Sequence, residues 1–279
     1  MLKKLLKYDF KSVFKYWWIA AISSFAVSIL GGFCITILES EKKMPDFLPT
    51  FAVIGIFITI MGLCAFLITS TILIYARFYK NLFTDEGYLT FTLPVKRSSL
   101  LNSKLILNIV TTVVSFFLFG IDILTMLLIG FNKQIFTLEF KQELLDFFAG
   151  VKEFFSELSP WFIAASAVEA ILIMFLSLVF SAMFMYGCIT FASVISKKAK
   201  VITVIGIYYV ANSVISGLIQ SVFLFSSQPL SEWFSKFPEA LYEPISALMG
   251  LCLVLILALG CALIYWFVYW LLDRKLNLA

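Results

Sequence analysis

The sequence contains no histidine. This absence excludes an intramembrane protease with a histidine base, a zinc site of the H-E-x-x-H kind and haem ligated by histidine. Charged residues are also scarce, because they make up 14% of the chain, whereas a soluble domain carries about 25%. Since 62% of the 279 residues are hydrophobic, the chain is not a large water-soluble domain.

A phosphate-binding loop of the form G-x-x-x-x-G-K-[ST] is also absent, since no glycine in the sequence is followed by lysine. In P-loop ATPases, this loop binds the phosphates of the nucleotide. We therefore expect no catalytic residues and no ATP hydrolysis by this chain alone.

Cysteine is present, but without a pattern that indicates chemistry. The five cysteines fall in apolar runs at unrelated spacings, at Cys34, Cys64, Cys188, Cys252 and Cys261. We interpret them as small buried hydrophobic residues rather than as disulfides or metal ligands.

Long apolar runs are abundant, and about 20 such residues suffice to cross a bilayer. Six runs have this length, at 17–38, 49–75, 105–131, 160–195, 201–225 and 245–272. The fourth has 36 residues, so we expect it to protrude, to tilt strongly or to be broken. The sequence thus predicts an all-α, polytopic membrane protein with six transmembrane helices, which form a single transmembrane domain over residues 1–279.

The distribution of basic residues predicts the orientation of these spans. Fifteen of the 21 Lys and Arg residues lie in the N-terminal arm, the second and fourth inter-span segments and the tail, that is in 1–16, 76–104, 196–200 and 273–279. The positive-inside rule then predicts that both termini are cytoplasmic in a cell membrane. The first run follows a long basic arm rather than a short n-region, so no cleaved signal is expected.

Three surface segments show amphipathic or mixed patterns. The arm 1–16 has apolar residues at helical spacing and five lysines elsewhere, which indicates an interface helix on anionic lipid, with packing on a cytosolic partner as the alternative. Segment 132–159 predicts an external amphipathic helix with an acidic polar face. For segment 226–244, three prolines among aromatic residues predict an external re-entrant or interfacial helical turn.

The loop 76–104 is unusually polar for this chain. Thr84 can cap a short helix, and Asp85 and Glu86 would lie in its first turn, where the helix dipole favours acids. Gly87 and Pro94 then break the chain. From the residues alone, the loop is either a short surface helix or an ordinary basic connection.

Residues 78–105, FYKNLFTDEGYLTFTLPVKRSSLLNSKL, resemble the cytoplasmic loop of ABC-2-type transporter permeases. The Gly-Tyr-Leu-x-x-x-Leu-Pro-Val-x-Arg core, with a lysine shortly after it, is the most specific part. The basic amphipathic start and the six-span layout resemble the family over nearly the whole chain, but less specifically. The resemblance implies a coupling helix that docks on a separate ATPase subunit through Thr84, Asp85, Glu86, Gly87, Tyr88, Leu89, Phe91 and Arg97. It also implies that ATP and Mg²⁺ are bound by that partner.

Two rows of small or polar residues lie within the spans. The first span has a ridge at four-residue intervals that includes Ser24, Ser28 and Gly32, which is typical of a helix interface. The fifth span has Asn212, Ser216 and Gln220 in one row, which we expect to face protein or a polar cavity. The family resemblance implies a dimer contact or a substrate path for both rows, and hydrogen bonding between helices is the alternative.

Two acids, Asp122 and Glu169, lie within spans, where a carboxylate is costly and suggests a functional site. Both fall in the outer halves of their spans. Snorkelling or protonation could satisfy them, and the alternative is a site for a cationic substrate or a proton.

These observations favour one half of an ABC exporter for an amphipathic peptide, an antimicrobial or a lipid-like molecule. Two such chains, identical or related, would assemble with two ATPase subunits in a lipid membrane, and no nucleic-acid partner is expected. The alternatives are an ion-coupled carrier that uses Asp122 and Glu169, and a non-transporting adaptor such as a sensor or immunity protein.

Overall fold

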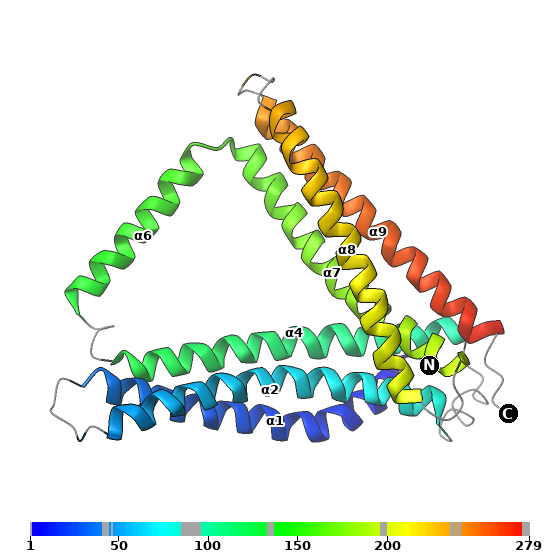
Figure 1. Cartoon of the computed structure of the whole chain (residues 1–279), viewed down its shortest axis with the longest axis horizontal. Coiled ribbons are helices and arrows are strands. Elements are labelled where there is room, and N and C mark those ends of the chain that lie inside the picture. The colour runs from blue at the N-terminus through cyan, green and yellow to red at the C-terminus, as the bar shows by residue number, and fades with distance from the viewer. Residues whose placement is uncertain are drawn as a thin grey trace. The chain divides into compact units, whose positions relative to one another are not determined.

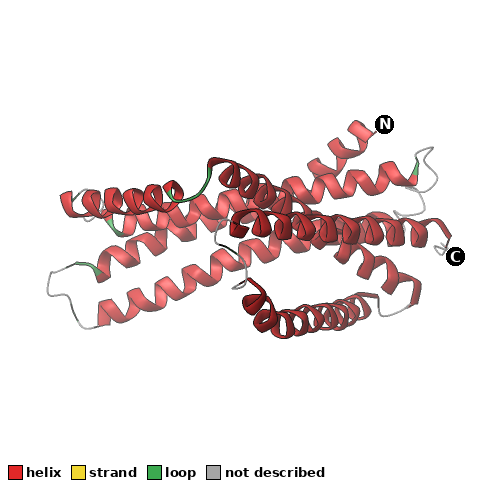
Figure 2. Ribbon diagram, turned by 90° about the horizontal axis from the view of Figure 1, so that it is seen from above, coloured by secondary structure: helices red, strands yellow, loops and turns green. Residues whose placement is uncertain are grey.

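The computed structural model describes residues 2–40, 45, 47–84, 96–132, 137–195, 200–234, 238 and 241–274. Within these ranges there is no β-strand, and almost every residue is helical (Figure 2). The helices are α1 (Leu2–Leu38), α2 (Phe47–Phe83), α4 (Arg97–Gly130), α6 (Leu138–Ser156), α7 (Pro160–Ile195), α8 (Lys200–Phe234) and α9 (Tyr242–Arg274).

Six of these helices, all but α6, are long and apolar enough to cross a membrane. A helix is the form that such runs take because it satisfies every internal backbone hydrogen bond without water. The predicted all-α, polytopic membrane fold is therefore confirmed.

The fourth predicted span coincides with α7, which is one unbroken helix of 36 residues. The alternative of a broken span is thus excluded for α7. At 1.5 Å per residue the helix is about 54 Å long, so it must protrude from the bilayer or tilt strongly. Its start is defined by Pro160 in the first turn and by the carbonyl of Ser159, which accepts hydrogen bonds from the amides of Phe162 and Ile163 at 3.0 and 3.1 Å.

Three predicted boundaries differ from the structure. The predicted loop 76–104 is shorter, because α2 continues to Phe83 and α4 begins at Arg97. The arm 1–16 is not a separate helix, because α1 runs from Leu2 to Leu38 without a break. Residues 226–234 continue α8 as helix, so α8 is longer than the predicted fifth span, and the re-entrant or interfacial location of segment 226–244 stays a prediction.

The contacts divide the chain into two compact units, which each contain three of the candidate spans. The first unit comprises Met1–Asn81 and Asn102–Phe154, and the second comprises Leu82–Leu101 and Phe155–Ala279. Figure 1 shows α1, α2 and α4 side by side in the first unit and α7, α8 and α9 together in the second. A single permease domain over the whole chain stays a prediction.

In the first unit, α1 packs between neighbours at small residues. A Cβ placed on Gly31 would come within 2.5 Å of Thr59 on α2, and one on Gly32 would come within 2.7 Å of Ile129 on α4. Only glycine allows such close helix approach, as is usual between membrane helices. The core of this unit contains Trp17, which is fully buried against Phe66 at a ring-centroid distance of 6.2 Å.

In the second unit, α7 packs closely along α9 and contacts α8. Gly187 of α7 lies against Val268 and Ile264 of α9, and the rings of Phe184 and Tyr208 join α7 to α8 at a centroid distance of 5.9 Å. Met183 and Tyr186 are fully buried. The core of this unit therefore lies along the C-terminal half of α7, whereas most of the described residues of α8 are exposed.

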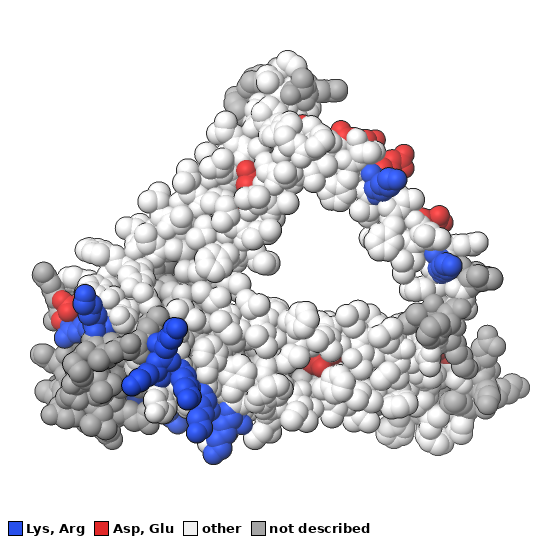
Figure 3. Space-filling model, turned by 180° about the vertical axis from the view of Figure 1, so that it is seen from behind, with Lys and Arg blue, Asp and Glu red and all other residues white. Residues whose placement is uncertain are grey.

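Charged side chains gather on two surface elements (Figure 3). The lysines of the α1 arm are exposed, at positions 3, 4, 7, 11 and 15. On α6, exposed charges alternate with exposed apolar side chains that include Leu144, Phe147 and Phe148. The helix predicted in segment 132–159 is thus confirmed, and its location on a membrane surface stays a prediction.

Candidate functional site

The most unusual polar group in the first unit is the carboxylate of Asp9, which is only 4% exposed. Its Oδ1 atom accepts hydrogen bonds from Lys104 Nζ at 2.5 Å and from Asn81 Nδ2 at 3.0 Å. The Nε atom of Arg77 lies 3.9 Å from the same oxygen. Three helices, α1, α2 and α4, therefore meet at one carboxylate, and we call these four residues the Asp9 cluster.

Burial makes the Asp9 cluster sensitive to the loss of any one charge. Lys104 is 3% exposed, so its ammonium group and the Asp9 carboxylate are both removed from water. Removing one partner of such a pair leaves an uncompensated buried charge, which typically costs about 3–5 kcal/mol. The cluster therefore fixes how the α1 arm lies against the other two helices.

The position of the Asp9 cluster matters because of the segment that its helices carry. Asn81 lies two residues before the end of α2 at Phe83, and Lys104 lies in the second turn of α4. Segment 84–96 joins these two helices. Both stems of this segment are consequently hydrogen-bonded to the same side chain on α1.

Sequence reasoning did not identify Asp9 and Lys104 as partners, although the sequence contains a signal. Asp9 is spaced four residues from Leu5 and from Val13, which belong to the apolar face of the arm. An acid on the apolar face of a helix that otherwise carries lysines indicates a buried contact rather than a solvated one.

Arg97, a predicted ATPase contact, has a partner within the second unit. Its Nη1 atom donates to the carbonyl oxygens of Leu272 at 3.0 Å and of Asp273 at 2.7 Å, and it pairs with Asp273 Oδ1 at 2.7 Å. A cation at these carbonyls satisfies the unpaired C-terminal end of α9. Arg97 thus links the first turn of α4 to the last turn of α9, and a contact with a further subunit stays a prediction.

The other predicted loop contacts fall mostly outside the described residues. Thr84 follows the last residue of α2 and is half-buried. The structure does not describe the remaining ones, which are Asp85, Glu86, Gly87, Tyr88, Leu89 and Phe91.

The ridge on the first span is an interface between α1 and α4. Ser24 is buried, and its hydroxyl donates to Asp122 Oδ2 at 2.8 Å. Gly32 lies against Ile129, and Ser28 is fully buried and bonds to the carbonyl of Phe25 on its own helix. The interpretation of this ridge as a helix interface is confirmed, and a second role in a dimer or a substrate path stays a prediction.

The two acids within spans have different surroundings. Asp122 is 3% exposed and receives the Ser24 hydrogen bond, so it is buried rather than snorkelling. Glu169 on α7 is half-buried, and its carboxylate occupies the space left by the missing side chain of Gly250 on α9. Whether either acid binds a proton or a cation stays a prediction.

The polar row on the fifth span is open on the surface of α8. Asn212 and Gln220 are exposed, and Ser216 is half-buried with its hydroxyl bonded to the carbonyl of Ser213 at 3.2 Å. Apolar neighbours on the same helix, such as Val210 and Leu218, are exposed as well. Within this chain the row therefore has no covering helix among the described elements.

Among the described residues, no group of three Cys, Asp or Glu side chains is placed to hold a metal ion. A scan against protein-family models, a search of curated proteins and a search of solved structures each found no match to the chain.

Proposed function

We propose that this chain is the membrane-spanning permease subunit of an ATP-driven ABC exporter whose ATPase is a separate polypeptide. The observation that carries the proposal is the stretch GYLTFTLPVKR at 87–97, which resembles the loop core of ABC-2-type permeases. This stretch lies between the end of α2 at Phe83 and the start of α4 at Arg97.

The Asp9 cluster supports this function because a docking loop must transmit force to the membrane helices. If both stems were loose, a partner that moves the loop would only bend it. Here Asn81 on one stem and Lys104 on the other are held by the buried carboxylate of Asp9. A displacement of the loop would therefore reach α1, α2 and α4 together.

Arg97 supports the same function in the second unit. Its hydrogen bonds to the last carbonyls of α9 connect the C-terminal end of the loop to the last span, so a displacement of the loop would also move α9. In this proposal the loop lies in the cytoplasm, as the basic bias of the sequence predicts, and an ATPase subunit with bound ATP and Mg²⁺ docks on it.

A second permease chain fits the open polar row of α8. An amide in contact with lipid is costly, yet Asn212 and Gln220 are exposed in a helix long and apolar enough to span the membrane. A second chain would either bond to these amides or share a polar path with them. The row stands among apolar side chains, which suits an amphipathic substrate such as a peptide, an antimicrobial or a lipid-like molecule.

An ion-coupled carrier is the second candidate, and it is favoured by the surroundings of Asp122. This buried carboxylate is hydrogen-bonded by the neutral hydroxyl of Ser24. A buried acid beside a neutral donor can take up a proton. Transport driven by a proton gradient without any ATPase would favour this candidate over the exporter.

The test is co-expression of the tagged chain with a Walker-motif ATPase encoded in an adjacent reading frame, followed by purification and reconstitution. We expect the chain alone to be inactive on ATP, because it contains no phosphate-binding loop. We expect the ATPase to co-purify and the pair to transport an amphipathic substrate only when ATP is present. ATP hydrolysis by a contaminant-free preparation of the chain alone would refute the proposal.

A further inference from the structure

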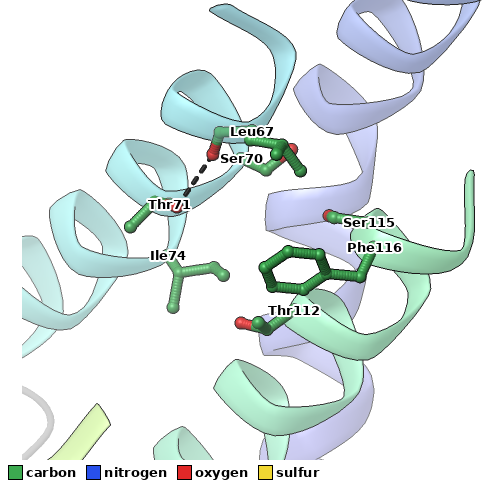
Figure 4. Close-up of a pocket in the computed structure, with 7 residues that line it drawn as sticks. All are labelled: Leu67, Ser70, Thr71, Ile74, Thr112, Ser115 and Phe116. Atoms are coloured by element: carbon green, nitrogen blue, oxygen red, sulfur yellow. Dashed lines mark hydrogen bonds between the residues drawn. The ribbon is translucent and has the colours of Figure 1, made fainter. Parts of the chain in front are cut away.

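A small cavity of about 40 Å³ lies between α2 and α4 in the first unit (Figure 4). Three of its lining residues are apolar, and Ile74 and Phe116 face each other across it (Figure 4). The other four carry hydroxyl groups: Ser70, Thr71, Thr112 and Ser115. A water molecule needs a cavity of about 10–15 Å³, so this one has room for at least one water.

Ser70 is the first sign that the cavity has a polar occupant. The residue is 2% exposed, and its Oγ atom has no hydrogen-bond partner among the described residues. Serine and threonine in membrane helices usually bond to a carbonyl of their own helix. The neighbouring Thr71 does so, with its hydroxyl 2.8 Å from the carbonyl of Leu67, whereas Ser70 does not.

Ser115 is the second sign, because only one of its hydrogen-bonding capacities is used. Its Oγ atom accepts a hydrogen bond from Trp17 Nε1 at 2.9 Å, and the residue is 3% exposed. The hydroxyl proton of Ser115 still needs an acceptor. Thr112 has the opposite need, since its hydroxyl donates to Asn108 Oδ1 at 3.1 Å and can still accept.

We propose that this cavity is a water-binding site, in which water bridges Ser70 on α2 to Ser115 and Thr112 on α4. The water would accept from the Ser115 hydroxyl and donate to the oxygens of Ser70 and Thr112. About three hydrogen bonds is the usual number for a buried water. This site stands on the geometry of the first unit and is independent of the transport function proposed above.

The bridge would extend to a third helix. Because Trp17 donates to Ser115, the bound water connects α2 through α4 to the buried indole on α1. A hydroxyl left unsatisfied in a membrane helix is expensive. Water therefore stabilises a polar contact that the three helices do not complete by themselves.

The direct test is an experimental map of the full chain in a lipid nanodisc, at a resolution that shows ordered water. We expect density within hydrogen-bonding distance of the hydroxyls of Ser70, Ser115 and Thr112. A dry cavity in a map that shows water at other buried sites would overturn the proposal.

The second test compares Ser70→Ala with Ser177→Ala in thermal unfolding. Ser177 is exposed on α7 and bonds to the carbonyl of Met174 on its own helix, so its variant is the matched control. If water bridges Ser70, its substitution should lower the melting temperature by about 2 to 4 °C more than the control. If the cavity is dry, removing an unsatisfied hydroxyl should leave the melting temperature unchanged or raise it, and the proposal fails.

Discussion

The Nζ atom of Lys104 lies 2.5 Å from Oδ1 of Asp9, and neither residue is more than 4% exposed. Arm lysines such as Lys11 are exposed and can meet water or lipid headgroups. The ammonium group of Lys104 instead pairs with a carboxylate inside the protein. The pair joins a residue near the start of α1 to one near the start of α4.

The polar contacts between these helices follow one another in the same order along both helices. After Asp9 and Lys104 come the hydrogen bonds of Trp17 with Ser115 and of Ser24 with Asp122, and then that of Thr36 with the carbonyl of Ile129. Both residue numbers rise together, so α1 and α4 run parallel. In a membrane, where hydrophobicity does not drive helix association, such polar contacts specify which faces meet.

The first prediction concerns the buried ion pair. Asp9→Leu should destabilise the protein by about 3–5 kcal/mol, because the buried Lys104 loses its ion pair with Asp9. The double variant Asp9→Leu with Lys104→Met should recover a large part of this loss, since it removes both charges. Equilibrium unfolding in detergent micelles measures the free energies of the wild type, of Asp9→Leu and Lys104→Met alone, and of the double variant.

Lys11→Met is the matched control, because Lys11 is an exposed lysine on the same helix as Asp9. We expect it to change the free energy of unfolding by no more than about 0.5 kcal/mol. If the effects of the two substitutions in the double variant simply add, Asp9 and Lys104 are not coupled, and the cluster does not act as described.

The spans could be predicted from the sequence because hydrophobicity and length decide them locally. Their ends could not, and α2 is the clearest case. Arg77, Lys80 and Asn81 indicated a loop, yet they continue the helix to Phe83. Arg77 and Asn81 both contact Asp9, and these contacts favour helix in a polar stretch that would otherwise form a loop. Asp9 lies 72 positions before Asn81 in the sequence, so the sequence around α2 does not reveal the contact.

The contacts of the candidate site could also be predicted only in part from the sequence. A ridge on α1 with Ser24 predicted an interface, and Asp122 was recognised as a costly acid, but nothing in the sequence pairs the two. Helical periodicity gives the face that a residue occupies. It does not give the partner helix or the register, which arise from the packing of whole helices. Hence Ser24 with Asp122, and Asp9 with Lys104, emerge only in three dimensions.

The second prediction concerns orientation in the membrane. Lys141 on α6 is exposed, and the basic bias of the chain places it outside the cell. In a cysteine-free background, Lys141→Cys should react with an impermeant maleimide in intact cells. Lys11→Cys, on the exposed face of the arm, is the control and should react only after permeabilisation. The reverse labelling pattern would show that the chain has the opposite orientation in the membrane.

The third prediction concerns the polar row on α8. Asn212→Leu with Gln220→Leu should weaken self-association in bilayers by about tenfold, because amide bonds between membrane helices contribute roughly 1–2 kcal/mol in total. Val210→Leu, at an exposed apolar position of α8, is the control and should leave it unchanged. Single-molecule photobleaching measures the dimer fraction. Equal dimer fractions in all three proteins would assign the row to a role other than a contact between chains.

The last prediction concerns the loop between α2 and α4. Tyr88 and Leu89 belong to the stretch that resembles the coupling element of ABC-2-type permeases, and large side chains of this kind usually dominate an interface, at about 2 kcal/mol or more each. Tyr88→Ala with Leu89→Ala should therefore weaken capture of the ATPase by well over tenfold, since about 1.4 kcal/mol already gives tenfold.

The measurement is co-purification of a tagged ATPase with wild-type and variant permease at matched expression. Phe147→Ala with Phe148→Ala is the control, because these exposed aromatic residues of α6 belong to the segment predicted to lie on the other side of the membrane. The melting temperatures of both variants should stay within a few degrees of the wild type, which is the check that the fold is intact. A loss of capture with an intact fold identifies a docking surface. Undiminished capture, together with unchanged ATP-dependent transport, would mean that the loop is an ordinary connection and that its likeness to a coupling element has no mechanical meaning.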